Sequence, residues 1–172
     1  MFKLKLLSSL LILCLTMSCS KNKGGVFIPA AEGEMTGKID NRTFKAQDDG
    51  VAVSLNIDSE EFQSLSINAV GEDGSIIVAL INNFKGAGTY QIVSDDSQLD
   101  YEAGVVYISP DEDPVTYYTP LDAGNHGSIQ IQEFSRQKAR GKFSATVYDP
   151  IAKKNVELTN MVFSTSAILV TE

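Results

Sequence analysis

Apolar and polar residues alternate with a period of two along most of the chain after residue 34. Between residues 51 and 57, Val, Val, Leu and Ile alternate with smaller or polar residues, which predicts a strand with one buried face and one face toward water. Similar segments recur about every ten residues, separated by clusters of Gly, Asp, Asn and Pro. The predicted strands are 35–39, 43–46, 51–57, 65–69, 76–81, 90–92, 105–107, 115–118, 129–131, 143–147 and 156–163.

The residues between these segments predict antiparallel pairing. Asp40 and Asn41 connect the first two segments as a tight turn, because both residue types tolerate a left-handed backbone. Residues 76–81 are apolar on both faces, which predicts a central strand. The last three segments predict a meander with turns at 136–140 and 149–155.

Only residues 59–63 show a trace of helical spacing. We therefore expect residues 35–172 to form one all-β domain, an antiparallel β-sandwich or flattened barrel of about eight to ten strands.

The first residues have the layout of a bacterial lipoprotein signal peptide. Lys3 and Lys5 precede an apolar run of about 10 residues, which is shorter than the roughly 20 needed to cross a bilayer. Ser18 then precedes Cys19, as in the lipobox whose cysteine receives diacylglycerol, although Thr16 stands where that motif usually has leucine. We expect residues 1–18 to be removed, Cys19 to carry a lipid anchor, and residues 19–34 to form a flexible tether.

The alternative is an ordinary signal peptide cut near Ser18. With lipidation, Ser20 in place of Asp favours the outer membrane over the inner membrane. Residues 20–23 lack the acidic run that accompanies export to the outer surface, so we expect the domain to face the periplasm, with surface exposure as the alternative.

Charge and cysteine content exclude several classes of function. Removing Lys3 and Lys5 from the 14 basic residues leaves 12 against 22 acidic residues, which changes the formal charge from −8 to −10. Nucleic acid is not an expected partner, because the basic residues are scattered. Cys14 and Cys19 are the two cysteines, so the folded domain is expected to contain no disulfide, catalytic thiol or cysteine-bound zinc.

Residues for catalysis or metal binding are few. His126 is the single histidine, it lies in a Gly-rich loop sequence, and no Gly-x-Ser-x-Gly motif accompanies it, so we predict an ordinary loop residue, no enzyme and no cofactor. Carboxylates cluster at Asp95, Asp96 and Asp100 and again at 111–113. They lack the spacing of a calcium loop, so solvated acidic turns are predicted and calcium binding stays open.

Five tyrosines lie between residues 90 and 118, beside the acidic segments. Tyr117 and Tyr118 are neighbours on a predicted strand, so one ring is expected to point inward and the other outward. Exposed rings beside carboxylates can stack on sugars or seat peptide side chains, whereas the alternative is that the rings fill the core. The candidate ligand-binding residues are Tyr101, Tyr107, Tyr117 and Tyr118.

Five segments follow one another along the chain in this order: MTGKIDNRTFKA, NNFKGAGTYQI, GSIQIQEF, GKFSATVYD and VELTNMVFS. In order and spacing they resemble an uncharacterised family of Bacteroidota-type lipoproteins, over roughly residues 35 to 168. The resemblance implies the β-fold and the lipid anchor, but no activity and no binding residue. Two family glycines are replaced, one by Met161 and one around Asn41 and Arg42, so both turns are expected to differ in detail.

Three functions fit these observations. The first is a non-enzymatic, lipid-anchored binding or accessory module that contacts a glycan or an envelope protein through loops between Asp95 and Pro120. The second is a lipocalin-like carrier with a small apolar ligand inside a closed barrel, which requires a cavity of about 300 Å³. The third is a carboxylate-dependent hydrolase, which requires two acids facing one cleft at about 5 to 10 Å.

Overall fold

The computed structural model describes residues 30–59, 62–93, 102–120, 122 and 124–171, and none of these residues is helical. They form eleven strands, so the predicted all-β class is confirmed and the strand number exceeds the expected range by one. The strands are β1 (Glu34–Ile39), β2 (Arg42–Ile57), β3 (Gln63–Gly71), β4 (Ile76–Ile81), β5 (Gly88–Val93), β6 (Ala103–Ile108), β7 (Thr116–Tyr118), β8 (Asn125–Ser135), β9 (Lys138–Asp149), β10 (Lys154–Thr165) and β11 (Ile168–Thr171).

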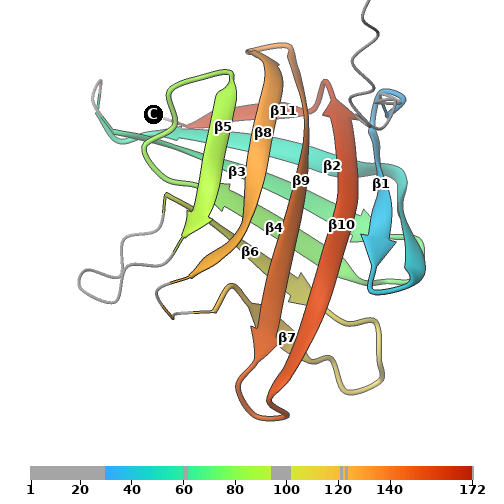
Figure 1. The fold of residues 1–172 in the computed structure, drawn as a ribbon. Coiled ribbons are helices and arrows are strands. Elements are labelled where there is room, and N and C mark those ends of the chain that lie inside the picture. Colours follow the sequence, from blue (N-terminus) through green and yellow to red (C-terminus); the bar gives the residue numbers. More distant parts are fainter. Residues whose placement is uncertain (1–29, 60–61, 94–101, 121, 123, 172) are drawn as a thin grey trace, which may run out of the picture.

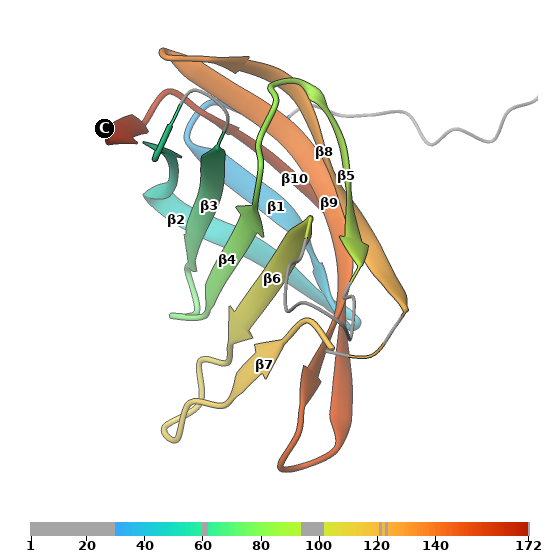
Figure 2. The same cartoon turned by 90° about the vertical axis from the view of Figure 1, so that its left-hand side faces the viewer.

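All eleven strands belong to one hydrogen-bonded sheet that curves back on itself. The order is β10-β1-β2-β3-β4-β6-β7-β9-β8-β5, and the additional pairing of β10 with β9 closes a ring. Figure 1 shows β5, β8, β9, β10 and β1 as a front layer, with β2, β3, β4, β6 and β7 crossing obliquely behind them. The view turned by 90° separates the same two layers (Figure 2). A flattened barrel with two facing layers describes this arrangement.

The interior between the layers contains closely packed apolar side chains. Residues on the inward faces of the strands are almost all buried, and several of the largest have no accessible surface at all. The largest fully buried side chains belong to Tyr107, Phe163, Met35, Leu65, Ile67, Ile77, Ile81, Ile92, Ile129, Ile131, Leu158 and Met161. An inner surface with so little accessible area leaves no water-sized void beside these side chains.

β2 joins two segments that the alternation predicts as separate strands. Ala46 and Val51 are both inward, and they pair with Gly71 and Ala69 of β3. The register shifts between these two pairs, because β2 has more residues there than β3. The extra residues form a bulge in which Asp49 adopts a φ of 56°. The bulge restores the alternation, so the second half of β2 keeps its apolar side chains in the core.

A second bulge brings β10 against β1. The register of β10 on β9 shifts between Leu158 and Met161, and Asn160 adopts a φ of 52° there. Met161, which replaces a glycine of the family, is fully buried. The left-handed backbone position of this bulge is that of the preceding residue, Asn160. Gly37 of β1 packs on this bulge, where an added Cβ would lie 2.9 Å from the Cα atom of Met161.

Most predicted turns and pairings are confirmed. Asp40 takes a φ of 51° in the opening hairpin, β4 lies centrally between β3 and β6, and β8, β9 and β10 form the predicted meander. The possible helix at 59–63 was a wrong prediction for Gln63, because this residue begins β3. Residues 60–61 lie outside the described part of the chain. The backbone amides of Asp58 and Ser59 donate to the Phe62 carbonyl, so a tight turn connects β2 to β3 here.

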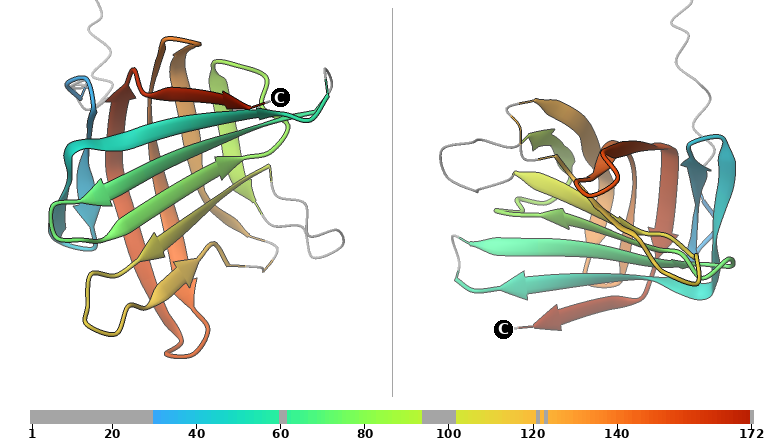
Figure 3. Two further views of the ribbon diagram at one scale, coloured as in Figure 1. Left: turned by 180° about the vertical axis from the view of Figure 1, so that it is seen from behind. Right: turned by 90° about the horizontal axis from the view of Figure 1, so that it is seen from below.

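The C-terminal strand β11 departs from the predicted antiparallel pattern. It pairs with β2 in parallel, with Ile168 opposite Val53 and Thr171 opposite Asn56. The Thr165 hydroxyl donates to the Val51 carbonyl at 2.9 Å and so fixes the chain where it leaves β10. Figure 3 shows β11 along the margin of the rear layer.

The predicted signal peptide, Cys19 and most of the predicted tether lie outside the described residues. The first strand begins at Glu34, one residue before the predicted start of the domain. The described residues include no helix that is long and apolar enough to span a bilayer.

Candidate functional site

Two of the four candidate tyrosines lie in the core. Tyr107 on β6 and Tyr117 on β7 are paired, and their rings stack with centroids 5.5 Å apart and planes at 29°. The two residues are 1% and 8% exposed, so a partner cannot reach them in the folded protein. Nη2 of Arg42 donates to the Tyr107 hydroxyl at 3.4 Å. Burial raises the pKa of this hydroxyl, and the guanidinium opposes the shift in part.

Tyr118 is the exposed member of the set, with 51% of its surface accessible, and Tyr101 lies outside the described residues. The prediction that Tyr117 and Tyr118 face opposite sides of their strand is confirmed. Tyr118 pairs with Tyr148 of β9, and this pair joins the two layers at the end of β7. Val147 is inward and buried, so Tyr148 shares the outward side with Tyr118.

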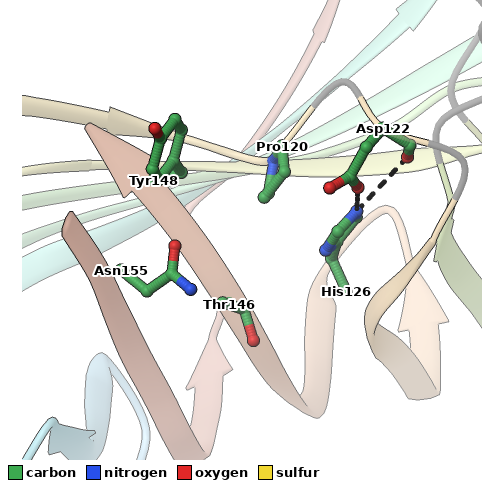
Figure 4. A pocket seen from close by; sticks show the side chains of 6 residues that line it. All are labelled: Pro120, Asp122, His126, Thr146, Tyr148 and Asn155. Atoms are coloured by element: carbon green, nitrogen blue, oxygen red, sulfur yellow. Dashed lines mark hydrogen bonds and ion pairs between the residues drawn. The ribbon is translucent and has the colours of Figure 1, made fainter. Parts of the chain in front are cut away.

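An open groove lies beside this pair and has a volume of about 510 Å³. We call it the seam groove, and its lining residues are Pro120, Asp122, His126, Thr146, Tyr148 and Asn155. Figure 4 shows Tyr148, Thr146 and Asn155, from β9 and β10, facing Pro120, Asp122 and His126, from the β7–β8 connection and the start of β8. The groove therefore draws on segments up to 35 residues apart in the chain, from Pro120 to Asn155.

His126 and Asp122 form the polar end of the groove. The His126 Nε2 atom lies 2.6 Å from Oδ1 of Asp122, with the two side chains 12% and 76% exposed. The same nitrogen lies 3.4 Å from the Asp122 carbonyl oxygen. The sequence places His126 in a loop, but it is the second residue of β8, and the neighbouring carboxylate fixes the orientation of its ring.

A local turn at the start of β8 brings His126 to the groove. The Asn125 Oδ1 atom accepts a hydrogen bond from the amide of Gly127 at 2.9 Å. Gly127 has a φ of 129°, and an added Cβ would overlap the carbonyl oxygen of Ser144 on β9. Glycine is therefore required for β8 to approach β9 so closely, and this approach positions His126 beside Thr146.

The groove combines ring surfaces with hydrogen-bonding groups. Tyr148 and Pro120 supply apolar surface, while Asn155 supplies an amide that both donates and accepts hydrogen bonds. The Thr146 hydroxyl donates to the carboxylate of Glu157 at 3.1 Å. Asp122 is the one carboxylate among the described residues that line the groove, so the two facing acids required by the hydrolase hypothesis do not occur in this lining.

The acidic segments do not assemble a metal site in the described part of the chain. Residues 111–113 lie exposed in the turn between β6 and β7, whereas Asp95, Asp96 and Asp100 lie outside the described residues. Among the residues described, no three His, Cys, Asp or Glu side chains gather closely enough to hold a metal ion.

Two further hollows of about 350 Å³ lie on other parts of the surface. One follows the outer side of β8 and β9 and includes Gln130 and Lys142. The other lies by Phe84, whose ring meets that of Phe134 edge to face with centroids 4.8 Å apart. Neither hollow includes a candidate residue from the sequence.

Sequence reasoning missed most of the groove. Of its six lining residues, the predicted contact region from Asp95 to Pro120 includes Pro120 alone, and none of the four candidate tyrosines lines it. One signal was present, because Tyr148 occupies an outward position next to the buried Val147, where an aromatic side chain is less common than a polar one.

A family model described as a domain of unknown function, DUF6252, matches residues 31–166. No curated protein and no solved structure matches the chain. The match covers all strands from β1 to β10 and confirms the expected relationship to an uncharacterised domain family. The chain therefore belongs to the DUF6252 family of domains of unknown function.

Proposed function

We propose that this protein is a non-enzymatic binding module of the bacterial cell envelope, held at the outer membrane by a lipid on Cys19, and that it binds a glycan in the seam groove. The anchor is supported by the sequence alone, through Lys3, Lys5, the short apolar run and the small residue before Cys19. Several acyl chains on one terminus make detachment negligible, because each buried methylene contributes about 0.8 kcal/mol.

The length of chain between the proposed lipid and the fold sets how far the domain lies from the membrane. The first strand begins at Glu34, so residues 19–33 connect the proposed lipid to the fold. Fully extended, such a segment spans at most about 50 Å. The domain therefore reaches glycans near the membrane that carries it, whether it faces the periplasm or the cell surface.

The seam groove is the observation that carries the proposed glycan specificity. Its volume of about 510 Å³ falls within the range of small-molecule sites. Sugar rings present an apolar face of C–H groups and a rim of hydroxyls, which match the ring of Tyr148 and the polar groups of Asn155, Asp122 and His126. Tyr118 extends the ring surface beyond the groove, because it pairs with Tyr148 on the same side.

The other two functions have less support. A carrier needs an internal cavity, but the inward side chains of the described strands are closely packed and nearly inaccessible. A hydrolase needs a second acid that faces Asp122 across a cleft. The Glu157 carboxylate accepts a hydrogen bond from the Thr146 hydroxyl but does not belong to the described lining of the groove, which offers an amide and hydroxyls opposite Asp122.

Binding of a panel of envelope oligosaccharides to the purified mature protein tests the glycan proposal. Tyr148→Ala is expected to weaken binding by about five-fold or more, because ring stacking contributes on the order of 1 kcal/mol or more. Phe62→Ala is the matched control, since Phe62 is 46% exposed but lies in the turn between β2 and β3. No binding to any oligosaccharide, or equal loss in both variants, would remove the glycan proposal.

The anchor is tested separately by Cys19→Ala and membrane fractionation. The wild type is expected to sediment with outer membranes, and the variant is expected to be soluble. A variant that still sediments with membranes would contradict lipidation at Cys19, whatever the outcome of the glycan experiment.

A further inference from the structure

One outward side of the rear layer is apolar, although it faces away from the core. On β4 and β6, the inward residues Ile77, Ala79, Val105 and Tyr107 are buried, so the residues between them point outward. Five of these outward residues form what we call the apolar face: Ile76, Val78, Leu80, Val106 and Ile108. Leu80 is 40% exposed and the other four are partly buried.

The apolar face is continuous across the two strands. Ile76 lies opposite Ile108, and Val78 lies opposite Val106, so their side chains are neighbours on one surface. Tyr118 lies opposite Val106 on the next strand and borders the face. Seen from behind, no described strand or turn crosses over β4 and β6 (Figure 3).

Most neighbouring outward positions are polar, as the solvated side of an antiparallel sheet usually is. β3 presents Ser64, Ser66 and Asn68 beside the apolar face, and β2 presents Ser54 and Asn56 beyond them. Val70, opposite Ile76, extends the apolar surface onto one end of β3. A contiguous apolar surface with a polar border is typical of a protein interaction site.

Acidic groups border one end of this face. The turn that follows Ile108 exposes the carboxylates at 111–113, and the turn before Ile76 exposes Asp73. Nearby, Lys45 is already paired with Glu72, and the Arg42 guanidinium donates to the Tyr107 hydroxyl. Among the described residues at this end, carboxylates therefore outnumber basic groups, and a positively charged partner can compensate the excess negative charge.

We propose that the apolar face docks a protein partner whose apolar segment is flanked by lysine or arginine residues. The charge distribution favours this partner over a second copy of the chain and over an anionic bilayer. A second copy brings the same acidic turns and adds to a formal charge of −8 per chain, and an anionic bilayer repels the same carboxylates. The proposal does not depend on glycan binding, because none of the five residues lines the seam groove.

Two synthetic peptides with the same apolar centre, one flanked by lysines and one by glutamates, test this proposal by fluorescence anisotropy with the full mature protein. The lysine-flanked peptide is expected to bind about ten-fold tighter or better, and added salt is expected to narrow this difference. Val78→Lys is expected to abolish binding of the lysine-flanked peptide. Failure of both peptides to bind, or equal affinities for both, overturns the proposal.

Ser54→Lys is the matched control, because it adds the same charge at an outward position on β2, away from the apolar face. Its affinity for the lysine-flanked peptide is expected to stay within about two-fold of the wild type. Val78→Thr keeps a β-branched side chain, which suits a strand, and replaces a methyl group by a hydroxyl at this outward position. It is therefore expected to weaken binding without loss of the far-UV circular dichroism spectrum. Equal loss of binding in Val78→Lys and Ser54→Lys would also overturn the proposal.

Two measurements test whether a second copy of the chain or a lipid surface covers the apolar face instead. Sedimentation velocity shows whether the protein forms dimers that Val78→Lys dissociates, and flotation with vesicles of phosphatidylethanolamine and phosphatidylglycerol shows whether the face binds lipid. The proposal predicts a monomer and no flotation beyond that caused by the lipid anchor. A dimer or a vesicle interaction that Val78→Lys removes would replace the protein partner with that occupant.

Discussion

Replacing Tyr117 by alanine is expected to lower the free energy of unfolding far more than replacing Tyr118, although the two residues are adjacent. Tyr117 is 8% exposed and stacks on Tyr107, whereas Tyr118 is 51% exposed on the outward side. Tyr117→Ala leaves a cavity in the core and is expected to cost about 3–5 kcal/mol of unfolding free energy. Tyr118→Ala is expected to cost less than about 1 kcal/mol, mainly through the lost cross-strand pair with Tyr148.

These free energies translate into separable melting curves. A domain of this size is stable by roughly 5–15 kcal/mol, so the larger cost removes a substantial part of the total. Each kcal/mol lowers Tm by about 3–4 °C at this chain length, which predicts a decrease of about 10–20 °C for Tyr117→Ala and of less than about 4 °C for Tyr118→Ala. Tyr117→Phe keeps the stacked ring and is expected to remain within about 1 kcal/mol of the wild type.

Urea denaturation and thermal melting, both followed by far-UV circular dichroism, measure the difference. Glycan binding then separates the roles, because Tyr118→Ala is expected to reduce affinity while the fold persists. Equal destabilisation by both alanine variants, or a Tyr117→Ala protein as stable as the wild type, would refute the assignment of one ring to the core and the other to the surface.

Three further predictions follow from particular residues. Gly127→Ala is expected to lower Tm by several degrees or more and to weaken glycan binding, because its Cβ displaces β8 from β9 beside His126; a calorimetric scan with unchanged Tm would contradict this. At Asn160, with its φ of 52°, Gly is expected to be tolerated and Val to cost about 1–2 kcal/mol in urea denaturation, and equal stability of the two variants would argue against the bulge. The pKa of Tyr107 is raised in the folded state, so the unfolded chain loses this proton first and folding stability decreases as pH rises above about 10; Tyr107→Phe is expected to show a smaller decrease in denaturation experiments between pH 9 and 11, and an identical decrease would exclude this contribution.

The strands were predictable because their period of two is encoded locally. Val51, Val53 and Leu55 are buried as the alternation implies, and the short polar turns between strands favour the antiparallel order. The alternation also placed Tyr117 and Tyr118 on opposite sides, but it does not say which side is inward. That choice depends on which strands surround β7 in the fold.

Features that depend on contacts between distant segments were not predictable. The bulge in β2 shows in the sequence only as a gap between two patterns, which also fits a loop. β11 pairs in parallel with a strand more than 100 residues earlier, with Thr171 opposite Asn56, and a short apolar run gives no sign of its partner. The seam groove depends on the pairing of Tyr118 with Tyr148, and the contact region predicted from the sequence reached it at Pro120 alone.

Glycan binding at the seam between β7 and β9 can be observed residue by residue. An isotope-labelled mature protein is titrated with the best oligosaccharide of the panel, and its backbone amides are followed by two-dimensional NMR. We expect shifts concentrated at Asp122, His126, Thr146, Tyr148 and Asn155, with little change elsewhere. Shifts centred on the apolar face or on the buried interior positions, or no shift with any oligosaccharide, would contradict it.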